Sequence, residues 1–176
     1  MADTAKTSAL AAVIFDRDGV LNVDHGFVGD IERLEWVAGA KTAVKRLNET
    51  GALVLVVTNQ SGVARGYFGE SAVGRVHGAM QADLASLGAR IDAFYVCPFH
   101  PRAVDPAYAH PDHPNRKPNP GMIFEALCDW RLAPGQVLLV GDKETDMEAA
   151  RRAGVRGALF TGGDLAIFLT DLGVLK

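Results

Sequence analysis

The sequence predicts an α/β fold in which helices cover both faces of a doubly wound, mostly parallel β-sheet. Short apolar or β-branched runs alternate along the chain with longer segments whose apolar residues recur at helical spacing. This alternation is typical of βαβ units, in which the strands are parallel. In addition, the runs 53–57 and 137–140 are apolar throughout, as expected of strands covered on both faces.

The elements are expected in strict alternation. The predicted strands span residues 12–15, 53–58, 91–97, 137–140 and 157–160. The predicted helices span residues 40–49, 71–87, 121–130 and 145–153. Gly51, Gly88 and Gly154 stand where glycine commonly ends a helix. The residues from Thr145 to Glu148 match a capping box, which predicts that the last of these helices begins there, with its acids at the positive end of the helix dipole.

Length and composition limit the class of protein. The 176 residues are enough for one well-cored domain, so we expect a single domain over 1–176 with residues 1–8 flexible. The net charge of −3 provides no global field for nucleic acid or an anionic membrane. Two cysteines, Cys97 and Cys128, are too few for a disulfide framework. With neither a signal peptide nor an apolar span, the sequence predicts a cytoplasmic protein, and we expect a monomer.

The stretch with the most chemical information directly follows the first predicted strand. Asp16 and Asp18 stand two residues apart in Asp-Arg-Asp-Gly, so both are expected at the carboxyl end of that strand. Ligands bind at this edge of open α/β sheets. A turn that contains Asp-Gly is the alternative interpretation of the same residues.

Polar residues also follow later strands. Thr58 ends the second strand and begins Thr-Asn-Gln-Ser-Gly, whose hydroxyl, amide and backbone N–H groups suit a phosphoryl oxygen, although they also suit a turn. Asp142 ends the fourth strand and Asp146 follows within a helical turn, where helix capping is the alternative. Arg116 and Lys117 lie at the entrance of a helix, and such a basic pair is usually solvated.

The combination favours phosphoryl transfer over accidental turns. Carboxylates that converge on one point are the hard oxygen ligands that Mg²⁺ prefers, with waters and substrate phosphate completing its coordination. A lysine close to them can neutralise the charge of the transferred group. The sequence therefore predicts Mg²⁺ as cofactor.

These motifs, in this order, resemble those of the haloacid dehalogenase (HAD) superfamily of phosphatases, which implies a HAD-like Rossmannoid sheet. Chain length leaves no room for a separate cap domain. The closer resemblance is to the D-glycero-D-manno-heptose 1,7-bisphosphate 7-phosphatases and the related histidinol-phosphate phosphatases. It rests on the segments 16–27, 58–66, 116–122 and 141–143, and it covers the chain from Ala11 to about Phe160.

The resemblance implies a role for each residue. Asp16 would be the nucleophile and Asp18 the proton carrier. Mg²⁺ would be held by Asp16, the backbone carbonyl of Asp18, and Asp142. The phosphoryl group would be stabilised by Thr58, Arg116 and Lys117. The remainder of the substrate would contact Asp24, His25, Gly26, Phe27, Asn59, Gln60, Ser61 and Lys143.

Two further residues are expected near the site. Arg65 is a candidate for a distal phosphate, with a surface salt bridge as the alternative, and Asp146 is expected to support the metal site from behind its ligands.

The resemblance implies a Mg²⁺-dependent phosphatase for the 7-phosphate of a heptose bisphosphate, an activity that would feed nucleotide-activated heptose synthesis. The expected partner is a small phosphorylated sugar, with neither nucleic acid nor membrane. Histidinol-phosphate phosphatase is the alternative within the same chemistry. A non-catalytic phosphosugar-binding protein on the same fold is the alternative from another class. It is disfavoured because the acids, the threonine and the lysine of the motifs are all present.

One loop departs from the pattern of the relatives. Many carry a zinc loop of Cys-x-His followed by Cys-x-Cys before the Arg-Lys-Pro. Here Phe99 replaces the histidine, and His113 and Asn115 replace the two later cysteines. Cys97, His100, His110 and His113 remain as an alternative ligand set. We expect the loop to be ordered by prolines and packing, without zinc.

Overall fold

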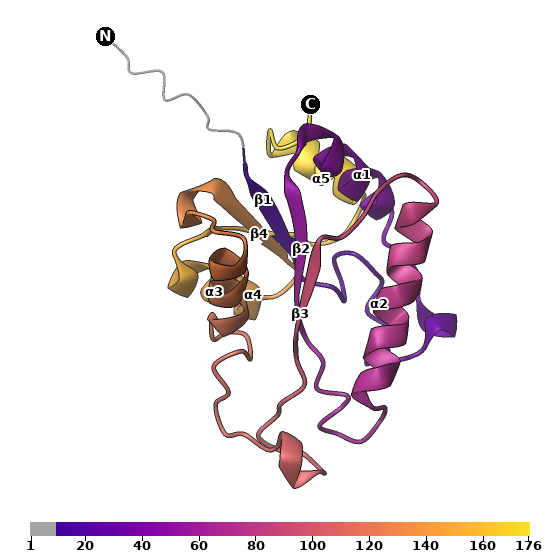
Figure 1. Ribbon diagram of the computed structural model, residues 1–176, viewed down its shortest axis with the longest axis vertical. Coiled ribbons are helices and arrows are strands. Elements are labelled where there is room, and N and C mark those ends of the chain that lie inside the picture. Colours follow the sequence, from indigo (N-terminus) through magenta and orange to yellow (C-terminus); the bar gives the residue numbers. More distant parts are fainter. Residues whose placement is uncertain (1–9) are drawn as a thin grey trace.

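The computed structural model describes residues 10–176 and contains one parallel sheet with helices on both faces (Figure 1). The strands of this part of the chain are β1 (Ala12–Phe15), β2 (Leu53–Asn59), β3 (Ala93–Cys97), β4 (Val137–Gly141) and β5 (Arg156–Leu159). Their order across the sheet is β3-β2-β1-β4-β5, and every neighbouring pair is parallel. The predicted fold class is confirmed, and no cap domain is present in the described residues.

The five α-helices of the same region form two layers. They are α1 (Ala40–Thr50), α2 (Glu70–Ala85), α3 (Gly121–Asp129), α4 (Glu144–Ala153) and α5 (Leu165–Asp171). Helices α1, α2 and α5 lie on one side of the sheet and α3 and α4 on the other (Figure 1). Short 3₁₀ helices are formed by Ile31–Arg33, Pro106–Tyr108 and Pro134–Gln136.

The alternation of side chains along β1 explains the two layers. Val13 and Phe15 pack into the core beneath α1, α2 and α5, whereas Ala12 and Ile14 pack into the core beneath α3 and α4. All four are fully buried, because the strand lies between two helical layers, and this explains why it is apolar throughout.

Three expectations need correction. Helix α5 was not predicted. Strand β3 begins at Ala93 rather than at Ile91, because the backbone N–H and carbonyl of Ile91 pair with the side chain of Gln81 on α2. The prediction of a capping box at Thr145 is wrong. Helix α4 begins at Glu144, and the side chain of Asp146 accepts a hydrogen bond from the backbone N–H of Lys143 at 3.1 Å. The expectation about residues 1–8 lies outside the described residues.

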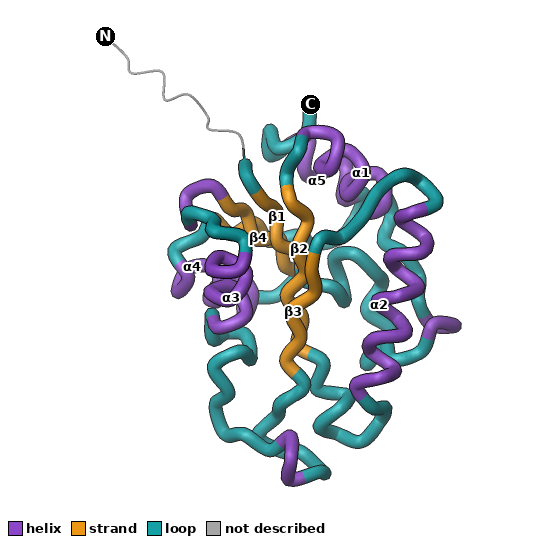
Figure 2. The backbone as a smooth tube through the Cα atoms, viewed as in Figure 1, coloured by secondary structure: helices purple, strands orange, loops and turns teal. Residues whose placement is uncertain are grey.

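The strand order locates the functional edge of the sheet. Successive strands run from β1 outward to β3, and the chain then returns to place β4 on the other side of β1. The topological switch point is therefore between β1 and β4, and ligands bind beyond the carboxyl ends of such strands. Figure 2 shows the long loop after β3 extending past the sheet at this end. No described helix is long and apolar enough to cross a bilayer.

Candidate active site

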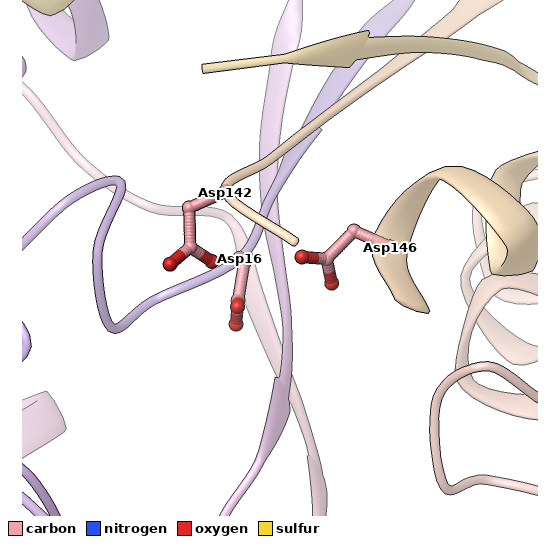
Figure 3. Close-up of side chains that lie close together, drawn as sticks. All are labelled: Asp16, Asp142 and Asp146. Carbon is pink, nitrogen blue, oxygen red and sulfur yellow. The ribbon is translucent and has the colours of Figure 1, made fainter. Parts of the chain in front are cut away.

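Three carboxylates converge at the switch point. Asp16 follows β1, Asp142 follows β4, and Asp146 lies in the first turn of α4 (Figure 3). One ligand oxygen from each lies within 4.8 Å of the others. Within residues 10–176, no other group of three or more histidine, cysteine, aspartate or glutamate side chains meets this distance.

Lys117 lies among these acids although its side chain is almost fully buried. Its Nζ is 2.9 Å from Asp16 Oδ1 and 2.6 Å from Asp146 Oδ1, and it donates to the carbonyl of Val57 at 3.0 Å. Burial alone would lower the pKa of Lys117, but the two carboxylates raise it above its usual value. The lysine is therefore held as a cation at the floor of the site.

Asp16 is the acid whose protonation is most affected by its surroundings. Burial raises the pKa of Asp16 to about 7, with Lys117 opposing the rise and the charge of Asp146 adding to it. The Asp16 carboxylate also accepts the backbone N–H of Arg17 at 2.7 Å. A second positive charge beside Asp16 would favour its ionised, nucleophilic form.

The donor set fits a divalent cation. Asp142 Oδ1 is buried and has no hydrogen-bond partner, and burial raises the pKa of Asp142. A Cβ at Gly19 would lie 2.3 Å from Asp142 Oδ2, so the loop after β1 approaches this acid as only glycine allows. Three carboxylates and one ammonium sum to −2, which a hard dication with oxygen ligands such as Mg²⁺ would balance. Asp16 and Asp142 have free ligand positions, whereas both oxygens of Asp146 already have partners.

Asp18 is held by a dense set of hydrogen bonds. Arg17 Nη2 donates to both of its oxygens at 3.0 Å, Asn22 Nδ2 donates to Oδ1 at 2.9 Å, and Gln60 Nε2 donates to Oδ2 at 2.8 Å. The carboxylate remains part of the cavity wall. Its orientation is therefore fixed by neighbours while one edge faces the site.

The residues that end β2 connect the acids to the lysine. Thr58 is buried, and its Oγ1 accepts a hydrogen bond from Gln60 Nε2 at 2.8 Å. The side chain of Asn59 donates to the carbonyl of Lys117 at 3.0 Å and accepts its backbone N–H at 3.1 Å. This pair of bonds places Lys117 against the end of β2.

These groups surround a cavity of about 410 Å³. Its walls come from the loops that follow β1, β2 and β4 and from the segment before α3. The lining residues are Asp16, Asp18, Asp24, Gly26, Phe27, Asn59, Gln60, Ser61, Arg116, Lys117, Lys143, Thr145 and Asp146. Most of the predicted site residues are thus brought together.

Two charged groups lie across the cavity mouth. Lys143 Nζ is 3.2 Å from Asp24 Oδ2 and 3.5 Å from Asp142 Oδ2, and its side chain is 54% exposed. Arg116 donates to the carbonyl of Phe99 at 3.1 Å. Both cations keep solvent-facing surface and remain available to an anionic ligand.

Some predicted residues lie elsewhere. His25 does not line the cavity, and its Nε2 is 2.8 Å from Glu35 Oε2 on the surface. Thr58 and Asp142 are not among the residues that line the cavity: Thr58 is buried, and the side chain of Asp142 is 19% exposed. Arg65 forms no ion pair with a described carboxylate, and its guanidinium lies 3.1 Å from His100 Nε2 and over the ring of Phe27.

Sequence reasoning missed two residues of the site. Thr145 lines the cavity, but the capping-box pattern assigned it to the start of a helix. Arg17 is fully buried against Asp18, although an arginine between two aspartates has the appearance of a solvated residue. The signal that could have found Arg17 is its position directly after a buried strand, between two residues that face the site.

The histidines of the loop after β3 are engaged in packing. Cys97 Sγ lies 4.0 Å from His113 Nδ1, which also accepts the backbone N–H of Asn115. The His113 ring stacks on Phe99, with centroids 4.0 Å apart. His100 Nδ1 accepts a backbone N–H as well. The four residues considered for zinc do not form a cluster of the kind formed by the three aspartates.

The chain is similar in sequence and fold to known proteins. A family model described as HAD-hydrolase-like matches residues 114–166. The D-glycero-β-D-manno-heptose-1,7-bisphosphate 7-phosphatase of Rhodopseudomonas palustris is 40% identical over 169 residues, which cover 96% of this chain and 93% of that protein. The corresponding α-anomer enzyme of Burkholderia mallei is 43% identical, covering 82% of this chain and 76% of that protein.

A solved structure agrees with the sequence matches. The D,D-heptose 1,7-bisphosphate phosphatase of B. bronchiseptica, complexed with magnesium and phosphate, superposes with a TM-score of 0.77 and 32% identity over 94% of this chain and 88% of that one. The fold agrees, and so does the sequence identity over most of both chains. The chain belongs to the D-glycero-D-manno-heptose-1,7-bisphosphate 7-phosphatase family of HAD-like phosphatases.

Proposed function

We propose that this protein is a Mg²⁺-dependent phosphatase that removes the 7-phosphate of D-glycero-D-manno-heptose 1,7-bisphosphate. The observation that carries the proposal is the Asp16 carboxylate at the floor of the cavity, 2.9 Å from the buried Lys117 ammonium. The names of the relatives supply the substrate class.

The reaction proceeds in two displacements at Asp16. One carboxylate oxygen of Asp16 attacks phosphorus as the bond between phosphorus and the sugar oxygen breaks, and Asp18 gives its proton to that oxygen. Water then attacks the phosphoaspartate, Asp18 takes a proton from this water, and inorganic phosphate leaves with Asp16 restored. Fixed hydrogen bonds keep Asp18 beside the reacting group in both steps.

Cations and dipoles stabilise the transferred group. Lys117, Arg116 and the hydroxyl of Thr58 are the groups we assign to the phosphoryl oxygens. Mg²⁺ bound by Asp16, Asp142 and the backbone carbonyl of Asp18 would reduce the repulsion between the carboxylate and the phosphate. Asp146 acts through Lys117, whose ammonium it holds at 2.6 Å.

The rest of the substrate faces the outer part of the cavity. Asp24, Gly26 and Phe27 form one wall, and Asn59, Gln60 and Ser61 form another. Lys143 lies between Asp24 and Asp142, where its ammonium can meet a sugar hydroxyl or a second phosphate. We assign no contact with substrate to His25 in this arrangement, because its ring pairs with Glu35.

A substrate comparison tests the proposal. Phosphate release from the α and β anomers of heptose 1,7-bisphosphate and from histidinol phosphate is measured with Mg²⁺ present. We expect the highest kcat/KM for one of the heptose anomers. A strong preference for histidinol phosphate would contradict the substrate assignment.

The nucleophile is tested separately. Asp16→Asn keeps size and hydrogen bonding but removes the attacking charge, so we expect a loss of at least about 10⁴-fold in kcat with folding retained. Circular dichroism checks the fold. Turnover that survives in this variant would show that the mechanism is wrong.

We also propose that the protein acts as a monomer in the cytoplasm. All the groups assigned to the reaction come from one chain, and Cys97 and Cys128 are both free thiols. Light scattering of the purified protein tests the first statement, since a dimer mass at assay concentration would contradict it. Fractionation of cells tests the second.

A further inference from the structure

Beneath the cavity, a polar network joins Asp18 to the middle of α2. Arg17 has no exposed surface, and it is the largest fully buried side chain in residues 10–176. A buried guanidinium lowers the stability of the fold unless its N–H groups find hydrogen-bond acceptors. Here one side meets the Asp18 carboxylate and the other meets His77, which the proposed reaction does not use.

The contacts of Arg17 form a clamp. Nη2 donates to Asp18 and to the carbonyl of Val28 at 2.7 Å, and it lies 3.2 Å from Gln60 Oε1. Nη1 lies 3.3 Å from His77 Nε2. Because arginine has no acceptor, His77 must accept with Nε2 and carry its proton on Nδ1.

His77 is itself fixed from behind. Its ring stacks on Phe94 of β3, with centroids 4.1 Å apart and planes 13° apart. The ring is nearly buried, and burial together with the Arg17 charge lowers the pKa of His77 to about 4, so the acceptor nitrogen stays free of a proton at neutral pH. The ring cannot turn away without losing both the stack and the hydrogen bond.

Gln60, directly after β2, closes the network. Its Oε1 faces Arg17, and its Nε2 donates to Asp18 Oδ2 at 2.8 Å and to Thr58 Oγ1 at 2.8 Å. Asp18 is thus constrained by Arg17 and Gln60 together, each of which also contacts the other. Displacement of the guanidinium would remove one donor from each oxygen of the carboxylate and leave only Asn22 on Oδ1 and Gln60 on Oδ2.

We propose that Arg17 and His77 are positioning residues that hold the Asp18 carboxyl in place for proton transfer to the leaving sugar oxygen. The proposal rests on the proposed role of Asp18. It makes a specific prediction, because proton transfer matters most when the leaving group is a poor one. An alkyl alkoxide needs the proton, whereas 4-nitrophenolate departs without it.

The test compares two leaving groups in variants of His77. His77→Leu removes the acceptor, and His77→Gln keeps an acceptor of similar reach. The matched control is Met80→Ala, which cuts a buried apolar side chain three residues further along the same helix, outside the hydrogen-bond network of Arg17. Each variant is assayed for kcat/KM on heptose 1,7-bisphosphate and on 4-nitrophenyl phosphate, and its fold is checked by circular dichroism.

We expect His77→Leu to lose about tenfold in kcat/KM on the sugar phosphate and less than about twofold on the nitrophenyl ester, as a partial loss of the general-acid contribution. The loss should lie in kcat rather than KM. His77→Gln should restore the ratio between the substrates. Met80→Ala should lower stability while leaving that ratio unchanged.

Arg17→Lys provides a second variant should loss of the His77 ring prevent folding. A lysine keeps the charge but cannot bridge Asp18 and His77 at once, so the same preference for the nitrophenyl ester should appear. Equal losses on both substrates, or a shifted ratio in Met80→Ala, would overturn the proposal. If the heptose bisphosphate is not hydrolysed by the wild type, the proposed function fails, and the ratio is measured with whichever alkyl phosphate the enzyme accepts.

Discussion

The floor and the mouth of the cavity use charge in opposite ways. At the floor, the side chains of Asp16, Lys117 and Asp146 are at most 10% exposed, and their contacts are 2.6 to 2.9 Å long. At the mouth, Lys143 and Asp24 are 54% and 36% exposed, and their ion pair is 3.2 Å long. Buried pairs gain strength from low dielectric and depend on each other, whereas exposed pairs contribute little to stability.

This difference suggests that the floor positions the reacting groups, whereas the mouth binds the substrate. The floor is assembled by folding, so the reacting groups are in place before any substrate arrives, which is how enzymes avoid reorganisation during the reaction. The charged side chains at the mouth remain in contact with water, so a sugar phosphate can replace their weak ion-pair partners. We therefore expect substitutions at the floor to change stability and rate, and those at the mouth to change KM.

The largest effect on stability is expected from Lys117→Met. Removal of the ammonium leaves Asp16 and Asp146 buried without a cation, which should lower the free energy of unfolding by about 3–5 kcal/mol. Activity should be lost as well. Urea unfolding monitored by circular dichroism measures the first effect and phosphate release the second.

The partner of Lys117 supplies the control. In the double variant Lys117→Met/Asp146→Asn, one of the stranded charges is gone, so a large part of the stability should return while activity stays absent. If the single and double variants were equally unstable, the pair would not be the source of the effect.

The second effect concerns the pH dependence of stability. His77 has a folded-state pKa of about 4, below the usual value of 6.5. Between these values the unfolded chain binds more protons than the folded one, so this group adds stability that is complete above pH 6.5 and is lost as pH falls toward 4. The expected contribution is about 3 kcal/mol. His77→Gln should remove it.

The measurement compares urea unfolding of the wild type and His77→Gln from pH 4 to pH 7. Asp16 titrates in the same window with the opposite sign, because its folded-state pKa is raised to about 7, but it does so in both proteins. The difference between the two curves therefore reports His77. Parallel curves for the wild type and His77→Gln would contradict the expectation.

The third prediction concerns the metal. If Asp16 and Asp142 bind Mg²⁺ only in the folded state, Mg²⁺ at 100 times its dissociation constant should stabilise the protein by about 2.7 kcal/mol. Asp142→Asn should abolish this gain. The same variant should be at least as stable as the wild type without metal, because burial raises the pKa of Asp142 and disfavours its charge. Thermal melting in Mg²⁺ and in chelator measures both effects.

The sequence predicts the floor better than the mouth, for a physical reason. Strand β1 ends at Phe15, as its apolar run indicates, and the side chains that follow parallel strands must meet at one edge of the sheet. The direction of a loop side chain depends on backbone torsions that the sequence does not show. His25 precedes Gly26 and Phe27, which have φ values of +73° and +53°, and its ring turns to Glu35.

Long-range pairing also escapes local patterns. Nothing near Lys117 in the sequence shows that its ammonium lies between Asp16 and Asp146, because these contacts exist only after β1, β4 and α4 pack together. The burial of Arg17 depends in the same way on His77 and Gln60. Helix α5 escapes prediction because it has only seven residues and comes soon after two glycines, so the segment is too short to show a helical period.

The smallest effect on stability is expected at the mouth, from Lys143→Met. Both ion pairs of this residue are partly exposed, so the free energy of unfolding should change by less than about 1 kcal/mol. Its loss should nevertheless weaken substrate binding, because no ammonium at the mouth then offsets the negative charge of the second phosphate. We expect KM to rise about tenfold, which corresponds to about 1.4 kcal/mol, with kcat little changed.

His25→Gln provides the contrast within the same loop region. His25 is close to Asp24 in sequence but faces Glu35, so its replacement should change KM by less than about twofold, since it removes only a surface contact. Steady-state kinetics of both variants on one heptose anomer decide the matter. A KM effect of His25→Gln equal to that of Lys143→Met would mean that the loop closes over the substrate and turns His25 inward. Substrate binding would then arrange the residues of the mouth, whereas those of the floor are already in place in the folded protein.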